Sequence, residues 1–167
     1  MSELPPFLAA SPRLSAWLGI RPDGTVEVRS GRVEFGQGVL TAMAQIAAEE
    51  LDVDLARIRL VPVTTGLSPD EGWTAGSLSI QYGGAALRVA CADTRGIYLA
   101  TAGRVLGADA DTLTVTDGEI TAPDGRVTSF WELADDALLD TDATGTYPVK
   151  SADGYTIVGT SASRVDQ

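Results

Sequence analysis

The sequence predicts an α/β (α+β) fold in which two long helices pack on one small mixed sheet. Residues 39–51 and 80–106 carry apolar side chains at the three- and four-residue spacing of amphipathic helices. Around them lie short runs that alternate polar and β-branched residues and that are bounded by Gly, Pro or Asp-Gly, as strands are. With 167 residues and 44% hydrophobic content, the chain is long enough for one domain with its own core.

The segment before the first helix is expected to form an arm and a hairpin. Residues 1–15 contain three prolines and show no periodicity, so we expect an extended N-terminal arm. Residues 16–20 and 25–30 flank the turn sequence Arg21-Pro22-Asp23-Gly24 and predict two paired strands.

The segment after the first helix continues the α/β pattern. Residues 56–65 are predicted to form a strand. The buried stripe of the second helix includes Cys91, which we interpret as a small core residue rather than a reactive thiol.

The last third of the sequence predicts smaller elements. Residues 113–115 and 119–121 should pair as a hairpin across Asp117-Gly118. Residues 129–133 read as a short capped helix, because Ser129 and Glu132 stand three positions apart.

These elements divide the chain into three parts: the arm at 1–15, an α/β segment at 16–138, and an irregular tail at 139–167. The tail shows no strand or helix pattern that would tie it down, so we expect it to dock on a partner chain.

Composition excludes several classes of chemistry. The chain has no histidine, so it cannot supply an imidazole base, a Ser-His-Asp triad or a His-ligated zinc site. Its single cysteine cannot form an intrachain disulfide or ligate an iron–sulfur cluster alone. No apolar run reaches the roughly 20 residues of a membrane span. Residues 1–10 lack the features of a targeting signal, so we expect a cytoplasmic protein, or one that is exported together with a signal-bearing partner.

The charge balance argues against nucleic acid as a partner. The net charge is −11, the wrong sign for a phosphate backbone. Residues 108–146 hold ten Asp and Glu against one arginine, Arg126, and this acidic stretch is either a solvated face or a docking face.

Two glycine-containing segments have the character of a ligand site, each at the start of a predicted helix. In the first, Gly36 and Gly38 would let the backbone approach a ligand, and Gln37 can both donate and accept. The start of the following helix is also expected to offer free N–H groups to a ligand. In the second, residues 74–79, Ser77 and Ser79 could hydrogen-bond an anionic group. Both segments also have simpler interpretations: a strand-to-helix turn for the first, and a serine N-cap for the second.

The remaining candidates are two pairs of adjacent carboxylates. Glu49-Glu50 ends the first helix, where adjacent side chains diverge, so we expect a solvated helix terminus. Asp70-Glu71 lies in a loop. Neither pair is a convincing general base, and we predict no catalytic residue and no metal ligand in this chain.

At the same two segments the sequence resembles the molybdopterin-binding large subunits of the molybdenum hydroxylase family (xanthine dehydrogenase and aldehyde oxidase). The similarity is strongest to the branch that includes isoquinoline 1-oxidoreductase and nicotinate dehydrogenase. Residues 33–42, VEFGQGVLTA, resemble the family's cofactor segment, and residues 74–79, TAGSLS, resemble its second cofactor loop. Residues 14–18, 23–26 and 157–166 resemble the start of that branch's large subunit and the end of its first segment.

The resemblance implies a molybdenum–pterin cofactor, for which the cytosine dinucleotide is one candidate form, and an oxidoreductase that hydroxylates an N-heteroaromatic or aldehyde substrate. It assigns the following residues to cofactor binding: Gly36, Gln37, Gly38, Ala75, Gly76, Ser77 and Ser79. Phe35 would border the substrate channel, or simply pack in the core.

The resemblance also implies partners, because family large subunits are several times longer and carry a catalytic glutamate in a far C-terminal motif that these residues lack. We therefore expect a split subunit or a fragment, completed by the rest of the large subunit and an iron–sulfur subunit, with a flavin or cytochrome subunit as a further candidate. The alternative function is a non-catalytic assembly or interaction module that keeps the scaffold without binding cofactor.

Overall fold

A computed structural model describes residues 3–165. The first layer of the fold is the small mixed sheet that the sequence predicts. Strand β1 (Leu18–Ile20) pairs antiparallel with β2 (Val26–Val28), and β2 pairs parallel with β3 (Ile58–Leu60). The parallel pairing follows from the crossover between β2 and β3, which contains α2 (Val39–Leu51). The predicted helix over 39–51 is confirmed, whereas the third strand is shorter than the predicted 56–65.

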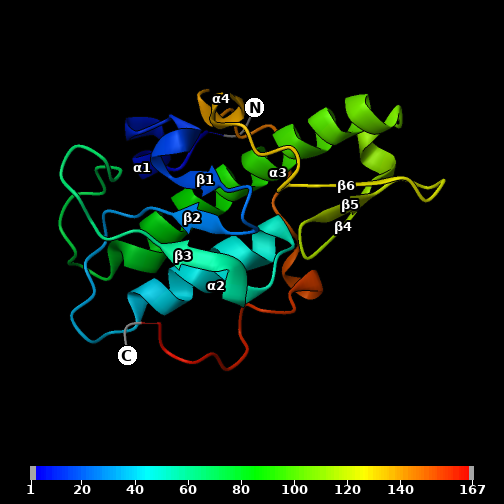
Figure 1. Ribbon diagram of the computed structural model, residues 1–167. Coiled ribbons are helices and arrows are strands. Elements are labelled where there is room, and N and C mark those ends of the chain that lie inside the picture. The colour runs from blue at the N-terminus through cyan, green and yellow to red at the C-terminus, as the bar shows by residue number, and fades with distance from the viewer. Residues whose placement is uncertain (1–2, 166–167) are drawn as a thin grey trace.

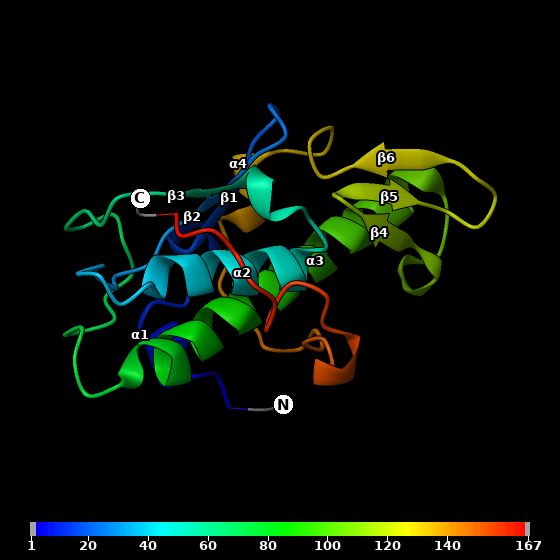
Figure 2. The same cartoon turned by 90° about the horizontal axis from the view of Figure 1, so that it is seen from below.

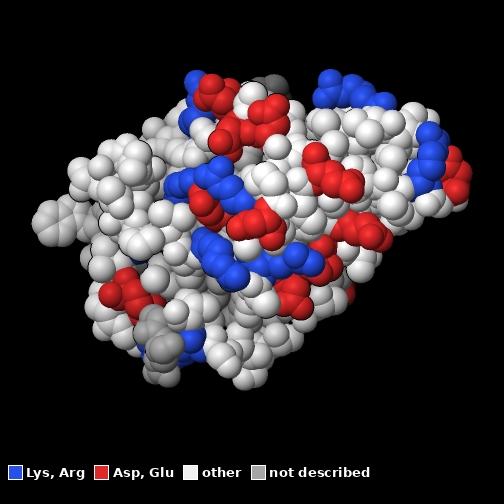
Figure 3. Space-filling model, in the orientation of Figure 1, with Lys and Arg blue, Asp and Glu red and all other residues white. Residues whose placement is uncertain are grey.

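Two helices form the second layer, on one face of this sheet (Figures 1 and 2). Helix α2 packs along α3 (Ala85–Leu106), and six residues before α3, Ser79–Gly84, form a π-helical turn. Cys91 is fully buried in this layer, as predicted, and burial raises the pKa of its thiol. The opposite face of the sheet carries charged side chains, which gather over β1–β3 in Figure 3. One face is therefore core and the other is surface.

A second sheet lies beside the C-terminal half of α3 (Figures 1 and 2). Strands β4 (Thr114–Thr116) and β5 (Glu119–Thr121) form the predicted hairpin, and β6 (Val127–Ser129) adds a third antiparallel strand. The prediction of a helix at 129–133 is wrong. The amide of Glu132 does donate to Ser129 Oγ at 3.1 Å, but this contact closes a turn after β6.

The N-terminal segment is not wholly extended as predicted. Residues Pro6–Ala10 form the short helix α1, which begins with a proline at its first position. The side chains of Leu8 and Leu14 are fully buried, and Phe7 makes an edge-on contact with Tyr82, with ring centroids 6.0 Å apart. Burial of these apolar groups attaches the segment to the helical layer.

The predicted solvated carboxylates at the end of α2 are instead buried. Glu49 and Glu50 are each 1% exposed. Glu49 Oε2 accepts the amides of Thr156, Ile157 and Val158 at 2.6–3.0 Å. Burial acts to raise the pKa of Glu49, but these donors and Lys150 outweigh it, and the pKa is lowered.

These contacts also fix the C-terminal segment. Glu50 accepts from Arg88 Nε at 2.8 Å and from the amide of Lys150 at 3.1 Å. Asp93 on α3 is 1% exposed and accepts the amides of Thr144 and Gly145. Residues 139–165 contain little regular structure after α4 (Asp136–Leu139), yet they are anchored to this chain's own helices.

Among the described residues, none of the helices has the length and apolar character required to cross a membrane.

Helix α3 packs closely against Tyr147 of the C-terminal segment at Gly96, and this contact can be tested. A Cβ at Gly96 would lie 2.1 Å from the Tyr147 ring, whereas a Cβ at Gly154 would meet nothing within 4 Å. We expect Gly96→Ala to destabilise the protein by about 1–3 kcal/mol through overpacking, despite alanine's better helix propensity. Thermal denaturation of the purified protein measures this.

Gly154→Ala is the matched control and should leave Tm nearly unchanged. In a Tyr147→Ala background the obstacle is gone, so Gly96→Ala should become neutral or stabilising. A destabilisation of equal size in both backgrounds would show that the ring contact is not its cause.

Candidate cofactor site

Two loops meet at the end of the molecule where the helical layer begins, on the left in Figure 1. The first, residues 29–38, connects β2 to α2, and the second, residues 61–78, connects β3 to the π-helical turn. They contain the two segments that the sequence singles out. Although 39 positions separate Gln37 from Gly76, the crossover brings both loops to one edge of the sheet.

A buried ion pair joins the two loops. The side chains of Arg32 and Glu71 have no exposed surface, and Arg32 Nε lies 3.3 Å from Glu71 Oε1. The other carboxylate oxygen of Glu71 accepts from the Ser30 hydroxyl at 2.5 Å and from the Gly31 amide at 2.6 Å. Because Glu71 bonds three consecutive residues of the first loop, it fixes the path of that loop.

Arg32 completes the connection from the other side. Its Nη1 donates to the carbonyl of Trp73 at 2.7 Å, and its guanidinium lies 4.7 Å from the centre of the Phe7 ring. The amide of Val33 donates to Thr74 Oγ1 at 3.0 Å. A Cβ at Gly83 would lie 2.4 Å from Glu71 Oε1, so the π-helical turn approaches this pair only because residue 83 is glycine.

In the first loop, Glu34 caps α2. Its Oε1 accepts the amides of Gly36 and Gly38 at 2.8 and 2.9 Å, and its Oε2 accepts the amide of Leu40 at 3.2 Å. The sequence suggests that this helix start offers free N–H groups to a ligand. For the amides that Glu34 occupies, this expectation is wrong, because the chain supplies its own anion there.

The amide side chain of Gln37 helps to shape the same loop. Its Oε1 accepts from the amide of Phe35 at 2.7 Å, and its Nε2 donates to the carbonyl of Val33 at 2.9 Å. The residue is exposed, and an amide retains one further donor and one further acceptor position after these two bonds. The loop contacts therefore hold Gln37 in place without using all of its hydrogen-bonding capacity.

The glycines beside Gln37 serve the backbone conformation. Gly36 and Gly38 have φ values of 106° and 77°, and a Cβ at either would meet nothing within 4 Å. Glycine is thus required here for the left-handed backbone and not for close packing within this chain.

The second loop presents donors that the chain leaves unused. Gly76 and Ser77 have consecutive positive φ values of 66° and 58°. Within residues 3–165, neither their amides nor the hydroxyls of Ser77 and Ser79 have a hydrogen-bond partner. The N-cap of the π-helical turn is Leu78, which has no side-chain cap, so the serine N-cap interpretation is wrong.

Both loops line one cavity of about 430 Å³. It is lined by Phe35, Gln37, Gly38, Val39, Ala42, Thr74, Ala75, Gly76, Ser77, Ser79 and Ile80. Of the residues that the resemblance assigns to the cofactor, only Gly36 does not line it. The structure thus brings the two predicted segments together as walls of one hollow, with apolar and hydrogen-bonding groups side by side.

Exposed aromatic side chains at this end of the molecule are a feature that the sequence alone does not identify. Phe35 is 71% exposed and Trp73 is 91% exposed, so neither packs in the core. Leu67 is 69% exposed and Ile80 is 48% exposed. This end is also poorer in charged side chains than the outer sheet face in Figure 3.

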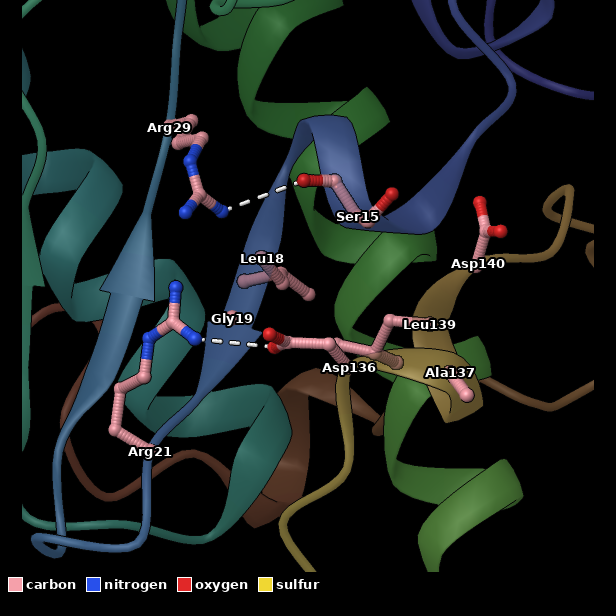
Figure 4. Close-up of a pocket in the computed structure, with 9 residues that line it drawn as sticks. All are labelled: Ser15, Leu18, Gly19, Arg21, Arg29, Asp136, Ala137, Leu139 and Asp140. Atoms are coloured by element: carbon pink, nitrogen blue, oxygen red, sulfur yellow. Dashed lines mark hydrogen bonds and ion pairs between the residues drawn. The ribbon is translucent and has the colours of Figure 1, made fainter.

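A second cavity, of about 410 Å³, lies between β1 and α4 and has a different character (Figure 4). Arg21 and Arg29 both pair with Glu27, at 2.7 and 2.5 Å, and Arg21 also pairs with Asp136 at 3.0 Å. The chain's own carboxylates therefore already neutralise these guanidinium groups. In the described residues, no group of three or more acidic or thiol side chains is placed to hold a metal ion.

Comparison with known families decides the identity of the fold. The model of the molybdopterin cofactor-binding domain matches residues 3–166, nearly the whole chain. This chain belongs to the molybdopterin cofactor-binding domain family. The two loops described above are thus the walls of a cavity in a molybdopterin-binding domain, and the family resemblance predicted from the sequence is confirmed.

Curated relatives of this domain are parts of much longer proteins. A nicotinate dehydrogenase polypeptide from Pseudomonas putida is 34% identical over 92% of the chain and 13% of its own length. An isoquinoline 1-oxidoreductase polypeptide from Brevundimonas diminuta is 32% identical over 70% of the chain and 16% of its own length. The chain therefore spans about one seventh of the length of these two relatives.

Solved structures agree with this assignment. CO dehydrogenase from Oligotropha carboxidovorans has a TM-score of 0.61 and 28% identity over 70% of this chain and 15% of its own. Quinoline 2-oxidoreductase from Pseudomonas putida 86 has a TM-score of 0.57 and 25% identity with the same coverage. A structure of a Cu,Mo-CO dehydrogenase has the same TM-score of 0.61, and the α/β fold of this chain is shared with these oxidoreductases.

The buried pair that joins the two loops of this domain yields a prediction. Glu71→Gln would leave Arg32 buried without its counter-charge, and we expect a loss of about 3–5 kcal/mol in the free energy of unfolding. Chemical denaturation of the purified protein measures it. Asp124→Asn is the matched control, because Asp124 pairs with Arg126 at the surface, where both side chains are 54% exposed. The control should be nearly neutral; equal effects would contradict the central role of Glu71.

Proposed function

We propose that this chain forms one wall of the molybdenum–pterin cofactor site in a multi-subunit molybdenum hydroxylase that oxidises an N-heteroaromatic or aldehyde substrate. The observation that carries the proposal is the single cavity lined by Gln37 and Gly38 from one loop and residues 75–79 from the other. Membership of the cofactor-binding family supplies the identity of the ligand.

The residues at the cavity fit the chemistry of this group. A pterin with a phosphate carries several acceptors, and the free amides and hydroxyls of Gly76, Ser77 and Ser79 are donors suited to them. Gln37 would hydrogen-bond near the molybdenum–dithiolene end, with Gly36 and Gly38 holding its loop. When bound, the cofactor would supply the two-electron redox chemistry of hydroxylation, and the protein would position it.

We further propose that the reaction needs groups from other chains. The two site loops contain three carboxylates, Glu34, Asp70 and Glu71, and each of them accepts at least one backbone amide of these loops. A catalytic glutamate and iron–sulfur clusters would therefore come from the rest of the large subunit and an iron–sulfur subunit. The same proposal includes a flavin or cytochrome subunit as a further partner. It also includes the cytosine dinucleotide form of the pterin and a cytoplasmic location.

The exposed apolar side chains at the mouth of the cavity support the need for a partner. Phe35 and Trp73 are large, mostly exposed aromatics beside the proposed site, and such groups are typical of interfaces. In this proposal Phe35 also borders the substrate channel. The short span of this chain relative to its relatives leaves ample polypeptide to cover this end.

Substitution of Ser77 and Ser79 tests whether their hydroxyls bind a ligand or stabilise the fold. Because the Ser77 and Ser79 hydroxyls bond nothing within the described chain, we expect the double variant Ser77→Ala/Ser79→Ala to keep the wild-type Tm. We also expect it to release molybdenum from the purified enzyme about tenfold faster, as measured by elemental analysis over time. A lowered Tm with unchanged molybdenum release would instead assign the hydroxyls to the fold.

Substitution of Gln37 tests directly whether this side of the cavity binds the cofactor. We expect Gln37→Ala to lower turnover and molybdenum content about tenfold while the complex still assembles, since the amide would contact the cofactor. Gln81→Ala is the control, because Gln81 is exposed and does not line the cavity. A purified complex without molybdenum, or a Gln37→Ala variant that loses assembly alone, would favour the non-catalytic assembly module.

A further inference from the structure

The C-terminal strap, residues 155–165, follows α2 backwards along one side. Glu49 accepts three amides from its start, Gln45 Nε2 donates to the carbonyls of Ile157 and Thr160 at 3.0 and 3.1 Å, and Thr41 Oγ1 accepts the amide of Val165 at 3.1 Å. The three contact positions on α2 are spaced by four residues, so they lie on one face of the helix. Figure 2 shows the strap crossing in front of α2 toward the start of that helix.

Where the strap reaches the start of α2, Arg164 contacts the first site loop. Its Nη1 donates to the carbonyl of Gly36 at 3.0 Å, and its Nη2 lies 3.6 Å from Glu34 Oε1. The same carboxylate oxygen receives the amides of Gly36 and Gly38. One guanidinium therefore contacts both the left-handed glycine and the carboxylate that caps the helix.

We propose that Arg164 is a positioning residue for the cofactor loop, and that the strap is the device that carries it there. The identity of the ligand that the loop binds rests on the proposed function. The contacts by which Arg164 holds the loop do not depend on it. Arg164 holds the carbonyl of Gly36, and Glu34 holds the flanking amides. Gln37 is thereby presented at the cavity from a backbone fixed on both sides.

Charge and conformation explain why the loop needs this contact. Gly36 and Gly38 have wide backbone freedom, so a loop that contains both must be ordered by external bonds. The Glu34 carboxylate also lies at the start of α2, where an added cation on its outer side balances its charge. Lysine could supply the charge but not the paired donors of a guanidinium.

The test uses the enzyme in its natural complex with Arg164→Ala, Arg164→Lys and the control Arg126→Ala, which removes an exposed arginine from the distant hairpin. Hydrogen exchange of the amides at 36–40 reports the loop. The rate of molybdenum loss reports the cofactor. We expect Arg164→Ala to accelerate both at least about tenfold, Arg164→Lys to give intermediate values, and the control to change neither.

Exchange at β4–β6 serves as the internal reference and should stay constant, which separates the expected effect from general unfolding. Unchanged exchange at 36–40 in Arg164→Ala would overturn the proposal, and so would faster exchange with unchanged molybdenum loss. A wild-type complex that contains no molybdenum would refute the proposed function, while the exchange data would still decide whether Arg164 orders the loop.

Discussion

The Glu71–Arg32 pair is the interaction on which the candidate site depends. Removing two charges from water costs several kcal/mol for each ion, and their mutual attraction alone does not reliably restore it. Here the hydroxyl of Ser30 and the amide of Gly31 bond the carboxylate, while the carbonyl of Trp73 and the ring of Phe7 contact the guanidinium. The pair therefore connects both loops and α1, and its contacts form only when all three are in place.

The same device recurs through the molecule. Glu34, Glu49 and Asp93 each accept two or more backbone amides from a loop or from the C-terminal segment. Most bonds of this kind join residues far apart in sequence to a helix. A chain with short strands and long irregular segments can in this way satisfy buried amides that no strand or helix pairs. The net charge of −11 thus includes several carboxylates with structural partners.

The sequence predicts the two long helices and singles out the two segments that line the cavity, because both predictions rest on local signals. Apolar spacing places α2, and glycines beside polar residues mark both loops. The polar contacts that hold the loops could not be predicted in this way. Nothing local separates Glu49, Glu50 or Glu71 from a solvated carboxylate, since their partners lie 38 to 109 positions away. The turn that replaces the expected helix at 129–133 shows a related limit. The expected contact between Ser129 and Glu132 does form. However, Ser129 itself belongs to β6, which pairs with β5, so the contact closes a turn and not a helix.

The capping of α2 by Glu34 makes the two sides of the cavity chemically different. On the Gly38 side, the Glu34 carboxylate already occupies amides at the start of α2, so these amides are not available as donors to a second anion. On the Ser77 side, amides and hydroxyls remain open as donors. An elongated ligand with one anionic end therefore has an electrostatically preferred orientation, with that end toward Ser77, before any contact specific to its rings is made. Glu34 thus favours one orientation of the ligand over the other, although its side chain need not contact the ligand.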